Sequence, residues 1–529
     1  MSLNKKLTLD FFVIFVIVLI ISYYVYFLLY VDPRILLYMV FDDAAYFLKV
    51  AANIASGHGQ TFDGYVFTTG LQPLWLWVLS ILSWVHTFSP EVTLRVVLLL
   101  QMFFLISASL LVYSVQSKIL SKEEGYIGLL LFFILVVPNA LNGMESALLI
   151  LVLCAFFSLG FIFSREHDLS YRNSAILGCV IGLIILSRID TIILAVTMLL
   201  LPLILAIFKI GEIKKCIVKT LIMIFCIFVV ISPYFIFNYF LTGYPLPISY
   251  LLKSTFPIVS FSKEPPYDGL NLLALFYVFG SLTYLAYFIS IVDKRSVMTL
   301  PQKYYLIFTT SMASYVVLHY LHTILFMKWA IFQWHFISYT IFGVLSATQF
   351  FAYIIHKLPD IRYSLILVLS LQALFTYPPY SPVGKLDNWQ TRSYEASQWA
   401  KSHTLINDTF AMSDAGIFSF FSGRRVINLD GVVNDIDYQD ILRNKSLNNY
   451  LISHGVHYLA QHAVHGRDEI AYGNYTKFPL SLISHRYGVW SDDLILRKSD
   501  EVYRSQLYYD GPYVSSFIIW DLSNTTDTV

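Results

Sequence analysis

Residues 41–75, FDDAAYFLKVAANIASGHGQTFDGYVFTTGLQPLW, follow the first apolar segment of the chain and place two adjacent carboxylates, Asp42 and Asp43, beside the membrane. Carboxylates next to lipid are costly unless water, a cation or a substrate compensates them, so the pair is a candidate functional site. The alternative is that both acids only stabilise the N-terminus of the helix expected at 44–56. The rest of the chain has to decide between these explanations.

The composition indicates a membrane protein with many spans. Of the 529 residues, 57% are hydrophobic and only 13% are charged, and the mean hydropathy is +0.65, which is far too apolar for a soluble protein of this size. A net charge of +1 excludes nucleic-acid binding through a basic field. The four cysteines lie in or beside apolar segments, so no disulfide framework is implied. The N-terminal apolar run has no small-residue cleavage site, which predicts a retained first span with its lysines in the cytosol.

Apolar runs of the length needed to cross a bilayer, about 17 to 25 residues, recur through a predicted transmembrane domain at 1–379. They occupy 10–31, 93–116, 126–142, 146–163, 217–241, 268–291, 303–320, 335–355 and 363–379. A further run at 175–208 is broken only at 187–191, which predicts two short helices joined by a turn that dips into the membrane. The total is about eleven crossings.

The short apolar run at 73–85 decides the topology. If it crosses, the later clusters of Lys and Arg fall on the side opposite the N-terminal lysines, and if it lies along the surface they all fall on the same side. The positive-inside rule favours the second arrangement, and the three tryptophans of the run suit a membrane interface. Residues 32–92 are therefore predicted to form one large first loop outside the cytosol.

Other segments are placed on this extracytoplasmic face of the plasma membrane by the same reasoning, namely 138–145, 187–191, 242–266, 321–334 and the polar tail 380–529. The tail pattern predicts a small α/β domain. Its expected elements are helix 390–402, strand 409–413, helix 415–422, strand 425–429, helices near 436–453, strand 456–461 and a hairpin near 480–498. Four N-x-[ST] sequons, at Asn407, Asn444, Asn474 and Asn524, are compatible with an outside location.

The unusual polar residues of the membrane half gather on this outer face. They are Asp42, Asp43, His58, Asp63, Glu145, Arg188, Asp190, Lys253 and Lys328. Each has a simple structural explanation: Glu145 can charge a helix N-terminus, Arg188 can pair with Asp190, the lysines can extend to the interface, and a histidine between two glycines suits a turn. Their coincidence on one face favours a functional site over these separate explanations.

A carboxylate base, several cations and a lipid-facing groove suit transfer of a sugar from a polyprenyl phosphate. An aspartate could take the proton from an acceptor hydroxyl as that hydroxyl attacks the anomeric carbon from the face opposite the phosphate, which inverts the centre. Arg or Lys could stabilise the charge that develops on the leaving phosphate. We expect Arg188 or Lys253 to contact the donor phosphate, with Lys328 as a further phosphate-binding residue.

The first-loop pattern F-DD-A-x-YF-x-x-x-A-x-NIA-x-GHG-x-x-FDG, followed by T-x-G-x-QPLW, resembles that of the GT-C superfamily of integral-membrane glycosyltransferases. This superfamily includes arabinofuranosyltransferases, lipid A aminoarabinose transferases and protein O-mannosyltransferases. The resemblance extends to GMESAL at 143–148, GYPLPISYLLK at 243–253 and SDAGIFSFFSGRRVINLDGVVND at 413–435. It implies a GT-C fold of about eleven transmembrane helices with a C-terminal extracytoplasmic α/β domain.

The same resemblance implies roles for individual residues. Asp42 would be the catalytic base with Asp43 beside it, and Glu145 would stand for the second acidic motif, with His58 and Asp63 on the acceptor side. The donor would be a polyprenyl-phosphate sugar and the acceptor a glycan, lipid or protein.

Metal use and the class of activity have alternatives. Asp430, Gly431, Asn434 and Asp435 could suggest a divalent cation site, but a turn between a strand and a helix explains them more simply, and no metal is assigned. A transporter or flippase for a lipid-linked or charged solute is the alternative function, because intramembrane charges also mark translocation paths. The absence of a matching interrupted half disfavours it. In a third interpretation the tail binds glycans and the membrane part only anchors it, although an anchor would not need buried charges.

Overall fold

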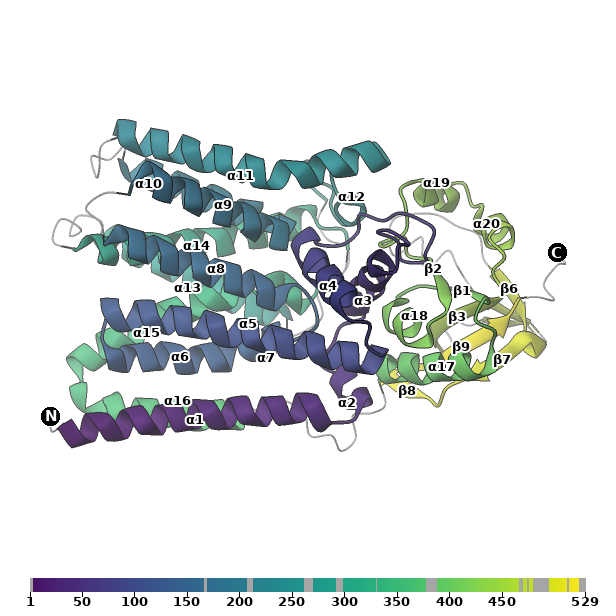
Figure 1. The fold of residues 1–529 in the computed structure, drawn as a ribbon, viewed down its shortest axis with the longest axis horizontal. Coiled ribbons are helices and arrows are strands. Elements are labelled where there is room, and N and C mark those ends of the chain that lie inside the picture. The colour runs from purple at the N-terminus through teal and green to yellow at the C-terminus, as the bar shows by residue number, and fades with distance from the viewer. Residues whose placement is uncertain are drawn as a thin grey trace.

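The computed structural model describes residues 3–165, 169–206, 213–260, 270–291, 298–329, 331–376, 388–465, 470–472, 475–478, 494–510 and 513–522. Long helices form a bundle at one end of the molecule, and an α/β unit forms the other end. Short helices of the first loop lie between the two (Figure 1). The predicted domain boundary at 379/380 falls in 377–387, outside the described residues.

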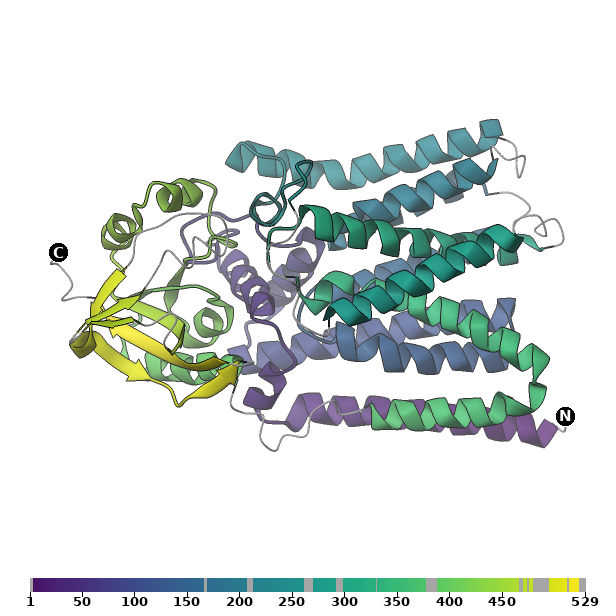
Figure 2. The ribbon, with the colours of Figure 1, turned by 180° about the vertical axis from the view of Figure 1, so that it is seen from behind.

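Seven helical segments of the described chain are long and apolar enough to cross a membrane. They are α1 (Leu3–Tyr30), α5 (Pro90–Ile119), α6 (Lys122–Leu135) continued by the short α7 (Val137–Ala140), α8 (Ser146–Ser164), α11 (Ile213–Thr242), α13 (Leu270–Ile291) and α15 (Tyr339–Lys357). Four more helices run beside them in both ribbon views (Figures 1 and 2), namely α9 (Tyr171–Ser187), α10 (Ile192–Leu205), α14 (Leu300–Phe326) and α16 (Arg362–Phe375). Within the described residues these helices account for the eleven or so apolar segments predicted from the sequence.

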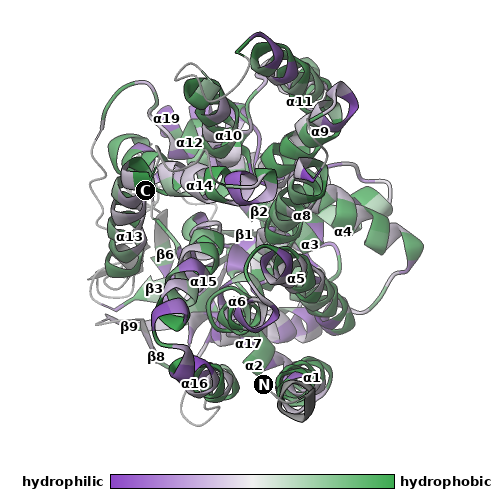
Figure 3. Cartoon of the chain, turned by 90° about the vertical axis from the view of Figure 1, so that its left-hand side faces the viewer, coloured by the Kyte–Doolittle hydropathy of each residue, from purple (hydrophilic) through white to green (hydrophobic). Residues whose placement is uncertain are grey.

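The bundle presents apolar side chains outward, as a lipid-solvated surface requires. On α11, Phe225 and Phe228 are 66% and 63% exposed. Seen from the end of the bundle away from the α/β unit and coloured by residue hydropathy, the helices at its periphery consist largely of apolar residues (Figure 3). The chain is an integral membrane protein on this evidence.

The predicted hairpin at 175–208 is present as α9, a single 3-10 turn η1 (Ile189–Thr191) and α10. Its turn is buried, with Arg188 only 5% exposed. The backbone N–H of Ile189 donates to the side-chain oxygen of Gln72 at 3.1 Å, so the turn is held against the first loop at the inner end of the bundle.

The first loop consists of three short helices, α2 (Pro33–Leu37), α3 (Asp42–Ala55) and α4 (Pro73–Val85). Helix α4 lies at the end of the bundle next to α3 (Figure 1), in keeping with the prediction that 73–85 does not cross. Trp75 is fully buried and its indole N–H donates to the carbonyl of Gly143 at 3.1 Å. Trp84 on the opposite side is 78% exposed, so α4 presents an apolar face outward.

The C-terminal unit contains the predicted alternation of helices and strands. It comprises α17 (Trp389–His403), β1 (Thr409–Met412), α18 (Gly416–Ser422), β2 (Arg425–Asn428), α19 (Asp437–Arg443), α20 (Leu447–Ser453) and β3 (Tyr458–Val464). The main sheet has the order β2-β1-β3-β9-β7, with β1 parallel to β2 and β3, and with β9 antiparallel to β3. The carboxyl ends of β1 and β2 therefore open at the same edge, and that edge faces the first loop.

The last strands were predicted less well than the first ones. Sequence analysis did not predict β7 (Glu501–Arg504), β8 (Tyr508–Asp510) or β9 (Tyr513–Asp521), which complete the main sheet. A second sheet contains β4 (Ile470–Tyr472), β5 (Tyr475–Phe478) and β6 (Leu494–Arg497). Most of the hairpin predicted near 480–498 lies outside the described residues, as do Asn474 and Asn524 of the sequons, whereas Asn407 and Asn444 are exposed.

Candidate functional site

The two neighbouring aspartates of the first loop have different surroundings. Asp42 is 5% exposed, and its carboxylate accepts the backbone N–H groups of Gly416 at 2.8 Å and Ile417 at 2.7 Å. These are the first N–H groups of α18, which have no partner within that helix. The contact is tight, because a Cβ on Gly416 would lie 2.2 Å from the backbone oxygen of Asp42. Each oxygen of Asp42 thus accepts one N–H that joins the first loop to α18, and the role of Asp42 as base stays a prediction.

Asp43 differs from Asp42 in its partners. It is half-buried, and among the described residues its carboxylate has no hydrogen-bond or ion-pair partner. Burial raises the pKa of Asp43, while the positive charge of Lys253 acts in the opposite direction. Burial also raises the pKa of Asp42 well above its usual value, so the two aspartates differ in their hydrogen-bond partners. The unpartnered oxygens of Asp43 are the more accessible proton acceptor.

Lys253 is the cation next to Asp43. It ends α12 (Ile248–Lys253), and its Nζ lies 5.3 Å from the centre of the Trp329 ring. The backbone N–H of Lys328 donates to the carbonyl of Lys253 at 3.0 Å, which fixes this turn. Within the described part of the chain the ammonium has no carboxylate partner at salt-bridge distance, so it is available to an anionic ligand.

Glu145, Arg188 and Asp190 form a buried ion cluster at the end of the bundle. Arg188 Nη1 donates to Glu145 Oε1 at 2.9 Å and to the carbonyl of Trp334 at 3.0 Å, and Nε and Nη2 both reach Asp190 at 2.9 Å. His319 Nε2 lies 3.4 Å from the other side of Asp190. Two carboxylates and a carbonyl already bind the guanidinium of Arg188, and its contact with a donor phosphate stays a prediction. The predicted pairing of Arg188 with Asp190 is confirmed.

The side chains of three other predicted site residues make their contacts outside the buried ion cluster and away from Asp43. His58 is exposed at the far end of α3, where its Nδ1 lies 2.9 Å from Ser56 Oγ. Asp63 accepts Arg425 Nη2 of β2 at 3.0 Å. The side chain of Lys328 reaches solvent, but partial desolvation of its amine lowers its pKa, and the positive charge of Arg443 acts in the same direction. Of these three, Asp63 links the first loop to the α/β unit, and none joins Asp43.

The structure adds Tyr46, which sequence analysis missed. Its hydroxyl accepts the N–H of Ala415 at 2.9 Å and donates to Asp430 Oδ2 at 3.3 Å. Tyr46 is one helical turn after Asp42, so the two side chains share a face of α3. That spacing was the available signal, but only the folded chain places the α/β unit opposite it.

Asp430 closes a turn, as the simpler interpretation predicted. Its carboxylate accepts backbone N–H groups of Asp414 at 3.0 Å and Val432 at 2.9 Å, together with the Asn428 amide at 3.0 Å. Among the described residues no group of three or more His, Cys, Asp or Glu is gathered in a way that could hold a metal ion. Metal use stays unassigned.

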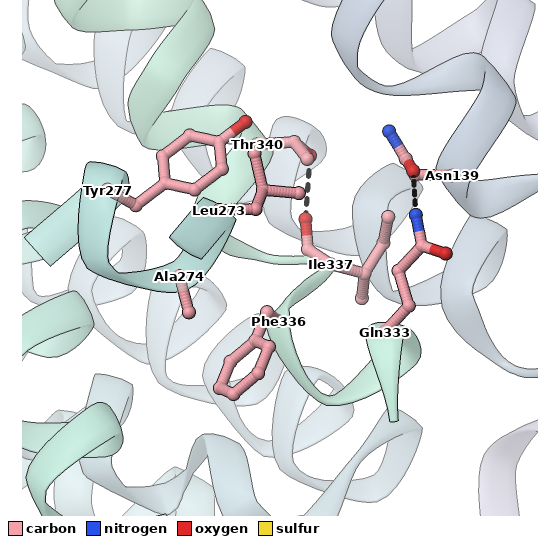
Figure 4. Close-up of a pocket in the computed structure, with 8 residues that line it drawn as sticks. All are labelled: Asn139, Leu273, Ala274, Tyr277, Gln333, Phe336, Ile337 and Thr340. Atoms are coloured by element: carbon pink, nitrogen blue, oxygen red, sulfur yellow. Dashed lines mark hydrogen bonds between the residues drawn. The ribbon is translucent and has the colours of Figure 1, made fainter. Parts of the chain in front are cut away.

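A small recess of about 20 Å³ lies between α13, α15 and the turn η4 (Gln333–Phe336). Leu273, Ala274, Phe336 and Ile337 make it largely apolar, and the amide of Gln333 donates to Asn139 Oδ1 at its edge (Figure 4). The neighbouring residue in η4, Trp334, offers its carbonyl to Arg188. An apolar recess therefore adjoins the buried charges at the end of the bundle.

Two solved structures share this architecture over most of the chain. One is the archaeal oligosaccharyltransferase AglB from Archaeoglobus fulgidus in complex with an inhibitory peptide and a dolichol-phosphate, with a TM-score of 0.52, 14% identity, and coverage of 87% of this chain and 70% of that one. The other is ArnT from Cupriavidus metallidurans bound to undecaprenyl phosphate, with a TM-score of 0.52, 7% identity, and coverage of 97% and 99%.

Sequence comparisons are less informative than the structural ones. A family model described as a domain of unknown function, DUF8728, matches residues 384–506, which is most of the α/β unit. No curated protein matches the chain.

The chain therefore shares its fold with these two solved membrane proteins over most of its length. A helical membrane bundle carries the short helices of the first loop at one end, with a C-terminal α/β unit on top.

Proposed function

We propose that this protein is an inverting glycosyltransferase that moves a sugar from a polyprenyl-phosphate donor to an acceptor hydroxyl on the extracytoplasmic face of the plasma membrane. The observation that carries the proposal is the half-buried Asp43, whose carboxylate is unoccupied and lies near the ammonium of Lys253 at the end of a membrane bundle. AglB and ArnT support the donor class, since one was solved with dolichol-phosphate and the other with undecaprenyl phosphate.

Asp43 is the general base in this proposal. It takes the proton of the acceptor hydroxyl while that oxygen attacks the anomeric carbon, and the bond from that carbon to the phosphate oxygen breaks on the opposite face. The raised pKa of Asp43 favours proton acceptance compared with an ordinary aspartate, provided that the group is ionised at the working pH.

Lys253 binds the phosphate in this proposal and stabilises the charge that grows on it as the sugar departs. An ammonium already ordered beside an aromatic ring needs little reorganisation to do so. Arg188 acts indirectly, by holding Glu145, Asp190 and the carbonyl of Trp334 in place.

The acceptor approaches from the α/β unit in this proposal, because that unit lies over α3 on the side opposite the bundle (Figure 2). The acceptor class is a glycan, lipid or protein hydroxyl. We place the N-terminus in the cytosol, so that the first loop and the α/β unit are outside, on the positive-inside argument.

The test is a transfer assay with the full chain in nanodiscs. A panel of radiolabelled polyprenyl-phosphate sugars is supplied with a cell-envelope extract as acceptor source, and labelled product is counted for the wild type and for Asp43→Asn. We expect one donor to be used and transfer to be lost in the variant. Transfer from nucleotide sugars instead, or undiminished transfer by Asp43→Asn, would contradict the proposal.

A transporter or flippase remains the competing function from another class. It predicts movement of a lipid-linked solute across liposomes without formation of a new glycosidic bond. Solute movement in liposomes without labelled product would favour it over glycosyl transfer.

A further inference from the structure

Glu145 has a buried carboxylate oxygen that nothing in the described structure satisfies. The residue is 2% exposed, and Oε1 accepts Arg188 Nη1 at 2.9 Å, but Oε2 has no hydrogen-bond partner among the described residues. Leaving such an oxygen unpaired is unfavourable, more so when the group is charged. Arg188 cannot supply a second charge-assisted bond easily, because Asp190 occupies Nε and Nη2.

The loop that carries Glu145 is rigidly held. Gln101 is buried inside the bundle, where its amide donates to the carbonyl of Met144 at 2.5 Å and its oxygen accepts the N–H of Gly143 at 3.0 Å. Asn142 Oδ1 accepts the N–H of Met144 at 3.0 Å. The free oxygen of Glu145 is therefore a fixed feature of a braced loop.

This loop lies directly against the start of α3. The N–H of Phe41 donates to the carbonyl of Asn142 at 3.4 Å, and a Cβ on Gly143 would lie 2.7 Å from the Cβ of Ala44. Glu145, which follows Met144 in this loop, is therefore held beside the first turn of α3, where Asp43 lies. The unsatisfied oxygen thus belongs to the same centre as the proposed base.

We propose that Glu145 Oε2 accepts a hydrogen bond from a donor group on the transferred sugar, and so selects a sugar that carries a hydroxyl or an ammonium at one defined ring position. The inference rests on the proposed function and adds the recognition element for its donor. A buried acceptor that is satisfied only by the correct substrate discriminates strongly, because an analogue lacking the group leaves it unpaired. A hydroxyl and an ammonium share this chemistry, and the experiment separates them.

The experiment uses the full chain in nanodiscs with short-chain polyprenyl-phosphate donors. The sugar that gives transfer is compared with its series of monodeoxy analogues, and with the analogue that carries an amine at the sensitive position, by kcat/KM. For the wild type, we expect kcat/KM to fall about 10- to 100-fold when one particular hydroxyl is removed, as for a lost hydrogen bond to a charged acceptor. For Glu145→Gln, we expect kcat/KM to fall less than 3-fold when the same hydroxyl is removed. The amine analogue separates the two chemistries: a gain over the hydroxyl donor identifies an ammonium partner, and a loss identifies a hydroxyl.

Glu123→Gln is the matched control, because it makes the same change in the first turn of α6 at the opposite end of the bundle. It should keep the wild-type discrimination. Should Glu145→Gln fail to fold, the deoxy series on the wild type still decides, because the absence of any sensitive position there overturns the inference. The inference is also overturned if Glu145→Gln and the wild type discriminate equally between the donor and its deoxy analogues. If the wild type transfers no donor at all, the proposed function is overturned as well.

Discussion

The two sides of helix α3 differ in how their polar groups are satisfied. Toward the α/β unit, Asp42 caps α18, Tyr46 joins Ala415 and Asp430, and Asp63 of the following loop pairs with Arg425. By contrast, Asp43 on the same helix has no partner within the described chain, and Glu145 of the bundle has one free oxygen. The paired groups stabilise the contact between the first loop and the α/β unit. The unpaired groups are the candidates for contacts with a ligand. Adjacent residues of one sequence motif thus take different roles.

The largest expected effect is on transfer by the Asp43→Asn variant. Removing a general base lowers kcat by about 100- to 10,000-fold, whereas Asp42→Asn should lower it far less, because that carboxylate caps α18. The wild-type rate should rise with pH through a pKa above the usual 3.8 of an aspartate, since burial raises the pKa of Asp43. Rates measured on both variants from pH 4 to 8 check this. An equal loss in the two variants would remove the distinction between the aspartates.

The second-largest effect is expected for Lys253→Met, because this change removes the unpaired cation near Asp43. We expect the KM for the donor to rise by about 10- to 100-fold, as when a charge-assisted hydrogen bond is lost, with a smaller change in kcat. Kinetics with the polyprenyl-phosphate donor check it, and Lys357→Met, at the far end of α15, is the control. An unchanged KM would show that the phosphate binds elsewhere.

Substitutions at the contact between α3 and the α/β unit should lower the stability of the protein more than they lower its transfer rate. Asp42→Ala removes the acceptor of two N–H groups at the start of α18, which should lower the free energy of unfolding by about 1 to 2 kcal/mol. Gly416→Ala should be more harmful, because its methyl would lie 2.2 Å from the Asp42 backbone oxygen. Thermal unfolding in detergent measures both. A Gly416→Ala protein as stable as the wild type would contradict the close approach of α18 to α3.

Lys49 should give the smallest effect, and it has a defined pH dependence. Its amine lies against the α/β unit, where it donates to the carbonyl of Arg424 at 3.4 Å, and burial lowers its pKa to about 8. The unfolded chain keeps the usual pKa of 10.5, so between pH 8 and 10.5 the unfolded state binds more protons, and the stability contribution of Lys49 rises with pH. Relative to Lys49→Met, the wild type should therefore gain stability across that window. Urea unfolding at pH 7.5 and 10 measures the difference, and a constant difference would show that Lys49 is solvated in the folded state.

Much of the architecture could be predicted from the sequence alone, because apolar runs of spanning length and the broken run at 175–208 report directly on helices that must satisfy their backbone within lipid. The strands β1 to β3 were also readable from local patterns. Strands β7 to β9 were not predicted. The apolar run 517–520 in β9 was a local signal for a strand, but the pairing of β9 with β3 and β7 is a long-range choice that a local pattern does not encode.

The sequence by itself determined that acids and cations meet at one face of a membrane bundle, since hydropathy and the charges of the loops fix which segments share a side. It could not determine which aspartate is free. Asp42 and Asp43 are chemically identical neighbours, and only the docking of α18 against α3 gives one of them two N–H partners and leaves the other near Lys253. The sequence also could not show that three partners already bind the guanidinium of Arg188, because Glu145, Asp190 and Trp334 come from three separate parts of the chain. Roles that depend on whether an oxygen or a guanidinium is already occupied are decided by tertiary contacts, which residue type and spacing do not specify.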